Sequence, residues 1–268
     1  MAYFPVALQL YSLQEAISKD FEGTLHAVKE IGYDGVEFAG LFGHSAGDVA
    51  KVCRETGLIP ISAHEACDRF LEDYSPIVKQ YAEIGCQYIG IPSADLNCLP
   101  GGSDWTVYKN KVMAMSRQAR EYGITLLYHN HDFEFQKVKG KRILDMLYEE
   151  LPSDMLQAEL DLCWVNIAGE DPSEYLRKYK GRAPIVHFKD FYRCAGEVKA
   201  RTRTGHNSQE YFEFRPIGSG MQNIAALVKA CEFTGCHWII VEQDEPTPGM
   251  DALSCAAQSV RYLKQLFI

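Results

Sequence analysis

Four chemically reactive side chains each lie at or near the end of an apolar run in the second half of the chain: His129, Asp161, His187 and Glu242. They combine two imidazoles with two carboxylates. Ca²⁺ prefers all-oxygen sites, whereas mixed nitrogen and oxygen ligands suit Mn²⁺, Co²⁺, Zn²⁺ or Fe²⁺. A lone histidine in such a place is usually a hydrogen-bonded core or loop residue. Four such positions in succession predict one bound divalent metal ion instead.

The stretch from Tyr128 to Phe135 carries two histidines, His129 and His131, just after the run that begins at Ile124. Side chains alternate along a strand, so these two histidines are expected on one face. A pair of imidazoles at a strand's exit can ligate a metal, transfer protons or fill a core. The choice depends on what the other strands bring to them.

Three further residues are candidates for substrate contact. His64 follows an earlier apolar run, although a surface-loop histidine would occur there equally well. Lys189 is expected to face the interior, where an unpaired lysine is rare. It could polarise a substrate oxygen or pair with Glu242 or Asp244. Trp164 could form an apolar wall of the site or pack in the core.

Arginines are concentrated in the long polar segment between Asp190 and Gly220: Arg193, Arg201, Arg203 and Arg215. They could bind a phosphate or carboxylate of the substrate, and Arg215 is our candidate. A solvated charged loop would have the same composition. Loops of this length in a compact domain are usually functional or mobile.

A regular alternation of short apolar runs and helical patterns must position these residues. We expect strands at 6–10, 35–38, 58–63, 88–91, 124–131, 156–162, 184–189 and 238–243. We expect helices at 25–31, 45–56, 74–84, 103–122, 143–151, 172–179, 221–233 and 251–266. Several predicted helices are followed by a glycine, as is common at helix C-termini.

Eight strands that alternate with helices predict a parallel sheet with helical crossovers. A chain of 268 residues suits a closed (β/α)₈ barrel, which takes about 250 residues. An open doubly wound sheet is the alternative, but the first strand-to-helix turn lacks a glycine-rich nucleotide-binding motif. The predicted class is therefore α/β, with residues 1–268 as a single TIM-barrel domain. The strand ends of such a barrel converge at its C-terminal face.

Composition excludes several classes of function. The net charge is -9 and no basic run is present, which disfavours nucleic acid and anionic membrane surfaces as partners. No segment approaches 18 uninterrupted apolar residues, and the start does not resemble a secretion signal. Nine cysteines without a Cys-x-x-Cys pair favour free thiols in a cytoplasmic protein.

Five sequence blocks resemble the sugar phosphate isomerase/epimerase superfamily, whose members have the xylose isomerase-like barrel. The blocks are Tyr128-His-Asn-His131, Glu159-Leu-Asp-Leu-Cys-Trp164, Val186-His-Phe-Lys-Asp190, Gly218-Ser-Gly220 and Val241-Glu-Gln-Asp244. The fifth-strand histidines, the His-x-Lys-Asp block and the Val-Glu-x-Asp block are also similar to inosose dehydratase. The resemblance covers most of the second half of the chain.

The resemblance implies one divalent metal ion held by a glutamate, an aspartate, a histidine and a second glutamate. Asp161, His187 and Glu242 match the last three of these ligands. His129 stands where the family has its first glutamate, which puts the two-glutamate acid/base pair of the epimerases in doubt. Glu159, one pleat deeper on the neighbouring strand, or Glu134 could replace the missing ligand.

The primary hypothesis is a metal-dependent isomerase or epimerase acting on a keto sugar or sugar phosphate through an enediolate. Glu242 is the expected base, with His129 or His131 as the partner acid. The alternative is an inosose dehydratase-like lyase, which a histidine near the leaving hydroxyl would favour.

Two other classes remain. A metal-dependent phosphodiesterase of the endonuclease IV type would need more metal ligands and a basic surface. A non-catalytic sugar-binding barrel is the second. The expected partner is a small carbohydrate, and apolar helix faces would also suit a homo-oligomer.

Overall fold

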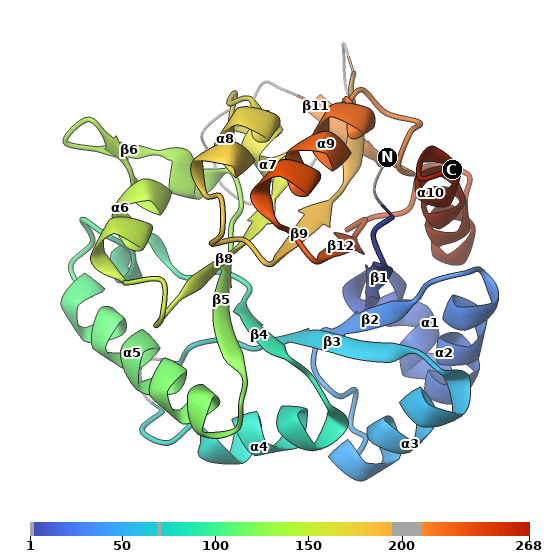
Figure 1. Ribbon diagram of the computed structural model, residues 1–268, viewed down its shortest axis with the longest axis horizontal. Helices are drawn as coiled ribbons and strands as arrows, with labels where there is room; N and C mark the ends of the chain where they lie inside the picture. Colours follow the sequence, from blue (N-terminus) through green and yellow to red (C-terminus); the bar gives the residue numbers. More distant parts are fainter. Residues whose placement is uncertain (1–2, 69–70, 195–210) are drawn as a thin grey trace.

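The computed structural model describes residues 3–68, 71–194 and 211–268. Eight parallel strands form a closed barrel in the order β1-β12-β9-β8-β5-β4-β3-β2, surrounded by helices (Figure 1). The barrel strands are β1 (Val6–Gln9), β2 (Gly35–Phe38), β3 (Ile59–His64), β4 (Tyr88–Ile91), β5 (Thr125–His129), β8 (Gln157–Asp161), β9 (Ile185–Phe188) and β12 (Trp238–Val241). The predicted barrel is confirmed, and the open sheet is excluded.

Helices follow the strands and cover the outside of the barrel. They are α1 (Gln14–Lys19), α2 (Phe21–Glu30), α3 (Ala46–Thr56), α4 (Ser75–Ile84), α5 (Trp105–Glu121), α6 (Ile143–Glu150), α7 (Leu162–Ile167), α8 (Pro172–Lys178), α9 (Ile224–Thr234) and α10 (Ala252–Leu266). Helix α3 shows how the sequence sets such boundaries. Ser45 accepts a hydrogen bond from the Asp48 amide at its start, and Gly57 adopts φ 69° at its end.

Side chains inside the barrel form an apolar layer beneath a polar one. Ala7, Leu127, Ile185 and Ile240 pack together with Ile61 and Trp238. Ala7, Leu127, Ile185 and Ile240 each precede by two residues a polar residue: Gln9, His129, His187 and Glu242, respectively. Because strand side chains alternate, the polar residues point into the same interior, one pleat nearer the C-terminal end. The apolar layer thus closes the barrel beneath the polar layer.

Two hairpins were not predicted from the sequence. The segment after β9, predicted to be a loop, contains the antiparallel strands β10 (Asp190–Cys194) and β11 (Tyr211–Arg215). Phe191 and Phe212 hold this hairpin by packing against Trp164. A smaller hairpin joins β6 (Lys137–Val138) to β7 (Lys141–Arg142). Its two turn residues both have positive φ, as a type I′ turn requires.

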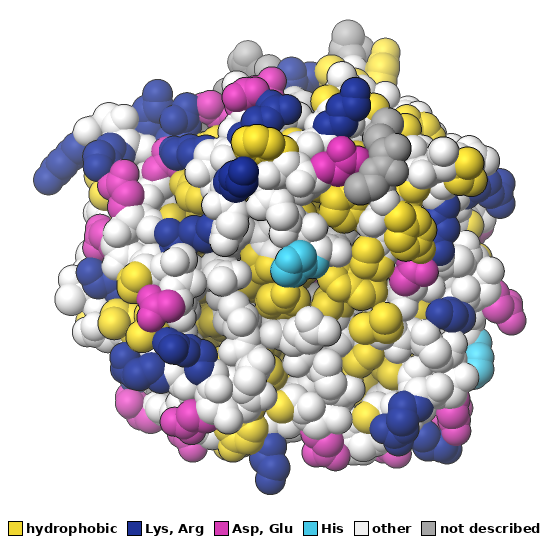
Figure 2. Space-filling model, viewed as in Figure 1, with side chains coloured by type: hydrophobic (Ala, Val, Ile, Leu, Met, Phe, Trp, Pro, Cys, Tyr) yellow, Lys and Arg dark blue, Asp and Glu magenta, His cyan; other side chains and the backbone are white. Residues whose placement is uncertain are grey.

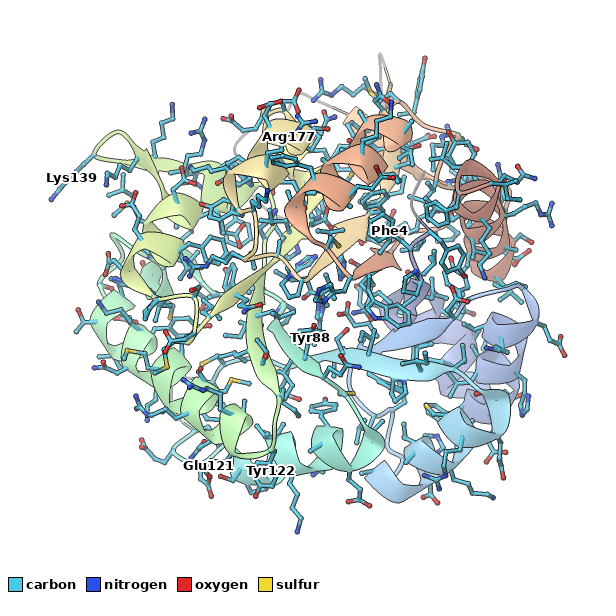
Figure 3. The ribbon with its side chains drawn as sticks, viewed as in Figure 1. Phe4, Tyr88, Glu121, Tyr122, Lys139 and Arg177 are labelled. Atoms are coloured by element: carbon cyan, nitrogen blue, oxygen red, sulfur yellow. The ribbon has the colours of Figure 1, made fainter. Side chains whose placement is uncertain are left out.

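The surface mixes charges of both signs. Figure 2 shows one face, where basic and acidic side chains are interspersed around the rim and hydrophobic side chains gather nearer the middle. In the same view Lys139, Glu121 and Arg177 point outward, whereas Tyr88 lies near the barrel ring (Figure 3). None of the described helices is long and apolar enough to span a membrane.

Candidate metal centre and its pocket

A pocket of about 370 Å³ lies at the C-terminal ends of the barrel strands. Its lining comes from residues far apart in the sequence: Tyr11, Ala39, Gly40, His64, Glu65, Pro92, Ser93, His129, His131, Lys189, Glu242 and Asp244. A volume in this range is typical of small-molecule sites. The pocket therefore lies where barrel enzymes of this architecture place their chemistry.

The pocket cluster comprises His129, Asp161, His187 and Glu242, whose ligand atoms all lie within 4.8 Å of one another. His129 Nε2 lies 3.4 Å from Asp161 Oδ2 and 3.9 Å from Glu242 Oε2. All four side chains are buried. The structure thus brings together the four residues that the sequence suggested as metal ligands.

Local hydrogen bonds orient two of these side chains. Asp161 caps α7, because its Oδ1 accepts hydrogen bonds from the amides of Cys163 and Trp164. His129 Nδ1 lies 3.3 Å from the carbonyl oxygen of Pro92, within hydrogen-bonding distance. A carbonyl only accepts hydrogen bonds, so Nδ1 carries the proton and Nε2 of the neutral ring presents its lone pair.

Two buried acceptor atoms consequently face each other without a hydrogen bond: His129 Nε2 and Asp161 Oδ2. Buried polar atoms in this state are rare and call for a missing partner. A divalent cation of intermediate hardness fits such a donor set. The residues present are therefore suited to hold a metal ion.

Directly beneath lies an interior cluster of Glu37, His64, Glu159 and His187, which meets the same distance criterion. Glu37 accepts hydrogen bonds from Gln9 Nε2 at 2.7 Å and from Ser62 Oγ at 2.5 Å. His64 Nε2 lies 3.0 Å from Glu159 Oε2. Most polar atoms of the interior cluster therefore have partners from the protein itself.

His187 belongs to both clusters. Its Nε2 lies 2.7 Å from Glu37 Oε1, and its Nδ1 lies 2.9 Å from Glu242 Oε2. A carboxylate on the second nitrogen of a metal-binding histidine fixes the orientation of the ring. Glu37 is thus placed to hold His187 with Nδ1 directed at the pocket.

Electrostatics separate the histidines into two groups. Burial lowers the pKa of His129 and, more strongly, that of His131. Burial also opposes the charge of His187, but Glu37 and Glu159 outweigh it and raise the pKa well above its usual value. The same two carboxylates raise the pKa of His64. His64 and His187 therefore favour the imidazolium form, whereas His129 and His131 favour the neutral ring.

Carboxylates of the pocket cluster are held in their charged form. Burial alone would raise the pKa of Asp161, but Lys189 and His129 lower it to about 2. Lys189 and His187 likewise hold the pKa of Glu242 well below its usual range against the effect of burial. Both carboxylates are thus anionic at neutral pH.

Lys189 is buried and lines the pocket. Its Nζ lies 2.7 Å from Asp244 Oδ1, 2.8 Å from Glu242 Oε2 and 3.3 Å from Asp161 Oδ2. The ammonium group also lies 5.4 Å from the centre of the Trp164 ring. Lys189 lies in the interior as predicted, and it pairs with both of the carboxylates considered from the sequence, Glu242 and Asp244.

The remaining candidates from the sequence lie in different surroundings. His64 and His131 line the pocket, although β5 ends at His129 rather than at His131. Trp164 is buried behind Lys189 and does not line the pocket. Arg215 lies on β11 beside Glu213, with which it pairs, and is likewise absent from the lining.

Glu134 and two loop arginines complete the list of candidates. The Glu134 carboxylate accepts hydrogen bonds from Tyr128 Oη and the His131 amide, so it supports the β5 exit and lies outside both clusters. Arg201 and Arg203 fall outside the described residues.

Gln9, Glu37 and Ser62 were not among the candidates taken from the sequence. Glu37 is the one polar residue of the short apolar strand β2. That position was the signal in the sequence that could have identified it as a functional residue. Its contact with His187 joins residues 150 positions apart.

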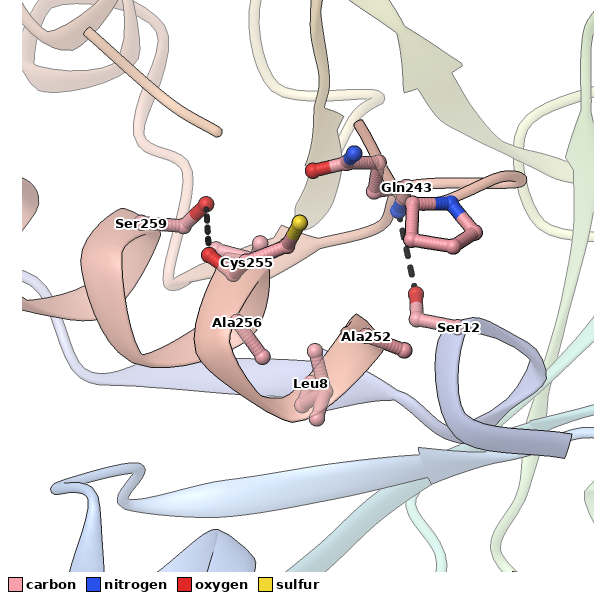
Figure 4. A pocket seen from close by; sticks show the side chains of 9 residues that line it. Leu8, Ser12, Gln243, Ala252, Cys255, Ala256 and Ser259 are labelled. Carbon is pink, nitrogen blue, oxygen red and sulfur yellow. Dashed lines mark hydrogen bonds between the residues drawn. The ribbon is translucent and has the colours of Figure 1, made fainter. Parts of the chain in front are cut away.

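A second cavity, between β1, β12 and α10, is much smaller (Figure 4). It offers about 10 Å³, enough for about one water molecule. Ser12 Oγ accepts a hydrogen bond from the Gln243 amide at its edge, and Gln243 Oε1 has no partner there. This cavity is too small for a substrate, which leaves the larger pocket as the candidate site.

Comparison with known proteins agrees with this architecture. Residues 25–266 match the model of the xylose isomerase-like TIM barrel family. The chain belongs to this family. An inosose dehydratase from Lacticaseibacillus casei is 23% identical over 162 residues, which cover 60% of this chain and 54% of that protein. The chain thus matches only about half the length of this curated relative.

Solved structures with a similar fold superpose over nearly the whole chain. A sugar phosphate isomerase/epimerase from Parabacteroides distasonis has a TM-score of 0.78 at 21% identity and covers 98% of both chains. The probable 3-DHS dehydratase from Bacillus anthracis has a TM-score of 0.70 at 15% identity and covers 98% of this chain and 99% of that one. The resemblance inferred from the sequence blocks is confirmed. Because these identities are low, the structural matches establish the fold and leave the reaction open.

Proposed function

We propose that this protein is a metal-dependent isomerase or epimerase that acts on a keto sugar through an enediolate. The observation that carries the proposal is the pair of unpartnered acceptors, His129 Nε2 and Asp161 Oδ2, 3.4 Å apart beneath a pocket of about 370 Å³. His129, Asp161, His187 and Glu242 would hold the metal ion. When bound, the ion supplies Lewis-acid polarisation of the substrate carbonyl, which acidifies the neighbouring C–H group.

Glu242 is the proposed base. It lines the pocket, and its low pKa keeps it ionised at neutral pH. Lys189 lies beside it and can donate a hydrogen bond to a substrate oxygen on which negative charge develops. The two residues thus place a proton acceptor and a fixed positive charge on one side of the pocket.

Electrostatics favour His64 for the return of a proton to the substrate. His64 lines the pocket, and its pKa is raised, so the ring carries a proton that it can donate. His129 and His131, the donors suggested by the sequence, have lowered pKa values and favour the neutral form. His131 is then better suited to hydrogen-bond a substrate hydroxyl than to protonate one.

The difference in pKa between His64 and His131 also bears on the alternative function, a lyase that removes water from a keto-cyclitol or keto sugar. Elimination needs an acid at the leaving hydroxyl; a neutral His131 would serve it poorly, so His64 would have to supply that proton. The lyase remains the second candidate because inosose dehydratase is among the relatives.

One experiment separates the two reactions. The metal-loaded protein is incubated in deuterium oxide with a panel of keto sugars and keto-cyclitols, and proton NMR and ultraviolet absorbance are followed together. We expect deuterium at the carbon next to the carbonyl without a change in absorbance. A rise in absorbance from an enone or dione product would replace the isomerase with the lyase.

A further inference from the structure

The pocket carries an excess of negative charge. Among its described lining residues, three are carboxylates (Glu65, Glu242 and Asp244), and Lys189 is the only lysine or arginine. Asp161 adds a buried carboxylate beneath the floor. Even with His64 counted as positively charged, a divalent cation at the pocket cluster would offset this charge without leaving a surplus of positive charge. A phosphate dianion needs such a surplus, usually from arginine or lysine.

Lys189 is already fully engaged. An ammonium group has three donor hydrogens, and its nitrogen lies within 3.3 Å of three carboxylates: Asp161, Glu242 and Asp244. Binding a phosphate through Lys189 would weaken its contacts with these carboxylates, and leaving the buried Asp161 or Glu242 without its counter-ion is costly. The lysine can share a donor with a hydroxyl or carbonyl oxygen far more readily.

The backbone site that barrels often use for phosphate is also filled. In (β/α)₈ barrels the loops after the seventh and eighth strands frequently bind phosphate through backbone amides. Here the glycine-rich segment after β11 directs the amides of Gly218 and Gly220 at Asp190 Oδ2, both at 3.0 Å. The Gln222 amide donates to Asp190 Oδ1 at 3.0 Å. The chain's own carboxylate thus takes the place of an external anion.

Gly220 shows how closely this carboxylate is enclosed. A Cβ atom at position 220 would lie 2.2 Å from Asp190 Oδ1. The amides and the carboxylate therefore form a closed internal contact with no room for a phosphate group.

From these three observations we infer that the site takes an uncharged, unphosphorylated keto sugar and discriminates against its phosphate esters. This inference rests on the proposed function, since it names the substrate class of the same pocket. The selectivity arises from the excess of carboxylates, the engaged Lys189 and the Asp190 contact.

The main test compares matched ligands on the metal-loaded, full-length protein. Ketohexoses such as D-fructose, 3-keto-hexoses and their 6-phosphates are assayed for binding by saturation-transfer NMR and for deuterium exchange next to the carbonyl. We expect the neutral member of a pair to bind at least about tenfold more tightly, equivalent to about 1.4 kcal/mol. Tighter binding of the phosphate ester would overturn the inference.

The two readouts also separate this inference from the proposed function. Binding of neutral sugars without any exchange would contradict the isomerase and leave the substrate class standing. Exchange with phosphate esters alone would support the isomerase and contradict the substrate class. If neither member of any pair binds, both proposals fail.

A second test concerns Asp190 itself. In Asp190→Ala the amides lose their anion, so inorganic phosphate is expected to raise the thermal midpoint by at least about 3 °C over chloride at equal ionic strength. The wild type and the control Asp171→Ala, which removes an exposed cap of α8, should show no such shift. If the Asp190→Ala variant fails to fold, the same phosphate-dependent shift is measured on Asp190→Ser. An equal phosphate shift in the wild type, or none in the Asp190 variant, would contradict the assignment of this contact.

Discussion

The pocket cluster and the interior cluster use the same kinds of side chain and even share His187, yet their surroundings differ. In the pocket cluster His129 Nε2 and Asp161 Oδ2 have no hydrogen bond, and His129 and Glu242 line the pocket. In the interior cluster Glu37 accepts hydrogen bonds from Gln9, Ser62 and His187. The one unpartnered atom there, Glu159 Oε1, lies 3.3 Å from His187 Nε2.

This difference shows that ligand type and mutual distance alone do not define a metal site. A carboxylate whose lone pairs are already used by protein donors gains little from a cation, because binding would first break those hydrogen bonds. We therefore propose that a metal ion would bind at the pocket cluster and that the interior cluster would support it. The corresponding expectation is one equivalent of Mn²⁺ or Co²⁺ per chain.

The largest expected effect is that of Asp161→Asn. The amide oxygen can still cap α7, but the anionic ligand is lost, so metal affinity should fall by more than about 100-fold, beyond the range typical of outer-shell changes. Isothermal titration calorimetry with Mn²⁺ measures both affinity and stoichiometry. Asp251→Asn is the matched control, because Asp251 caps α10 at an exposed position. Unchanged affinity in Asp161→Asn, or two equivalents bound by the wild type, would assign metal to the interior cluster.

Glu37→Gln tests the support that the interior cluster gives to His187. The carboxylate on Nε2 is lost, and metal affinity at pH 8 should fall by about 10- to 100-fold. Glu37 is one of the groups that raise the pKa of His187, so metal must displace a proton from that ring in the wild type at lower pH. Wild-type affinity should therefore rise with pH, and the variant should show a flatter dependence.

Ser62→Ala is the control for this comparison. It removes a hydrogen bond to the same carboxylate and keeps the charge next to His187. A loss of affinity in Ser62→Ala as large as in Glu37→Gln would indicate a general packing defect rather than orientation of His187.

The framework of this site could be predicted from local patterns. Strand β2 at Gly35–Phe38 and the Ser45 cap of α3 follow from alternation and capping, which act within a few residues. The convergence of His129 and Glu242 then follows from the closure of eight parallel strands. Local rules and one global constraint therefore suffice to bring the ligand residues together.

The hydrogen-bond and packing partners of the individual site residues could not be predicted from local patterns. The contact between Glu37 and His187 crosses the barrel, and it depends on strand stagger and on a register shift between Val36 and Glu37. The β10–β11 hairpin was also missed, because its stability comes from packing of Phe191 and Phe212 on Trp164 rather than from a local turn signal. Such tertiary contacts decide which of two similar clusters remains open to a metal.

The smallest expected effect is that of Gly90→Ala on metal binding. A Cβ at position 90 would lie 2.3 Å from Glu159 Oε2 and 3.0 Å from His64 Cδ2, so the interior cluster must shift. Overpacking of this kind should cost about 1–3 kcal/mol of unfolding free energy, measured by urea denaturation. Because none of the three atoms nearest to the new Cβ belongs to the pocket cluster, metal affinity should change by less than in Glu37→Gln.

Gly47→Ala on α3 is the control for Gly90→Ala, since its new Cβ would have no contact closer than 3.7 Å. A helical Gly→Ala change is expected to leave stability equal or higher. If Gly90→Ala instead lowered metal affinity as far as Asp161→Asn while the protein stayed folded, Glu159 would have to touch the metal. Glu159 would then belong with the metal-binding residues and not with the supporting interior cluster.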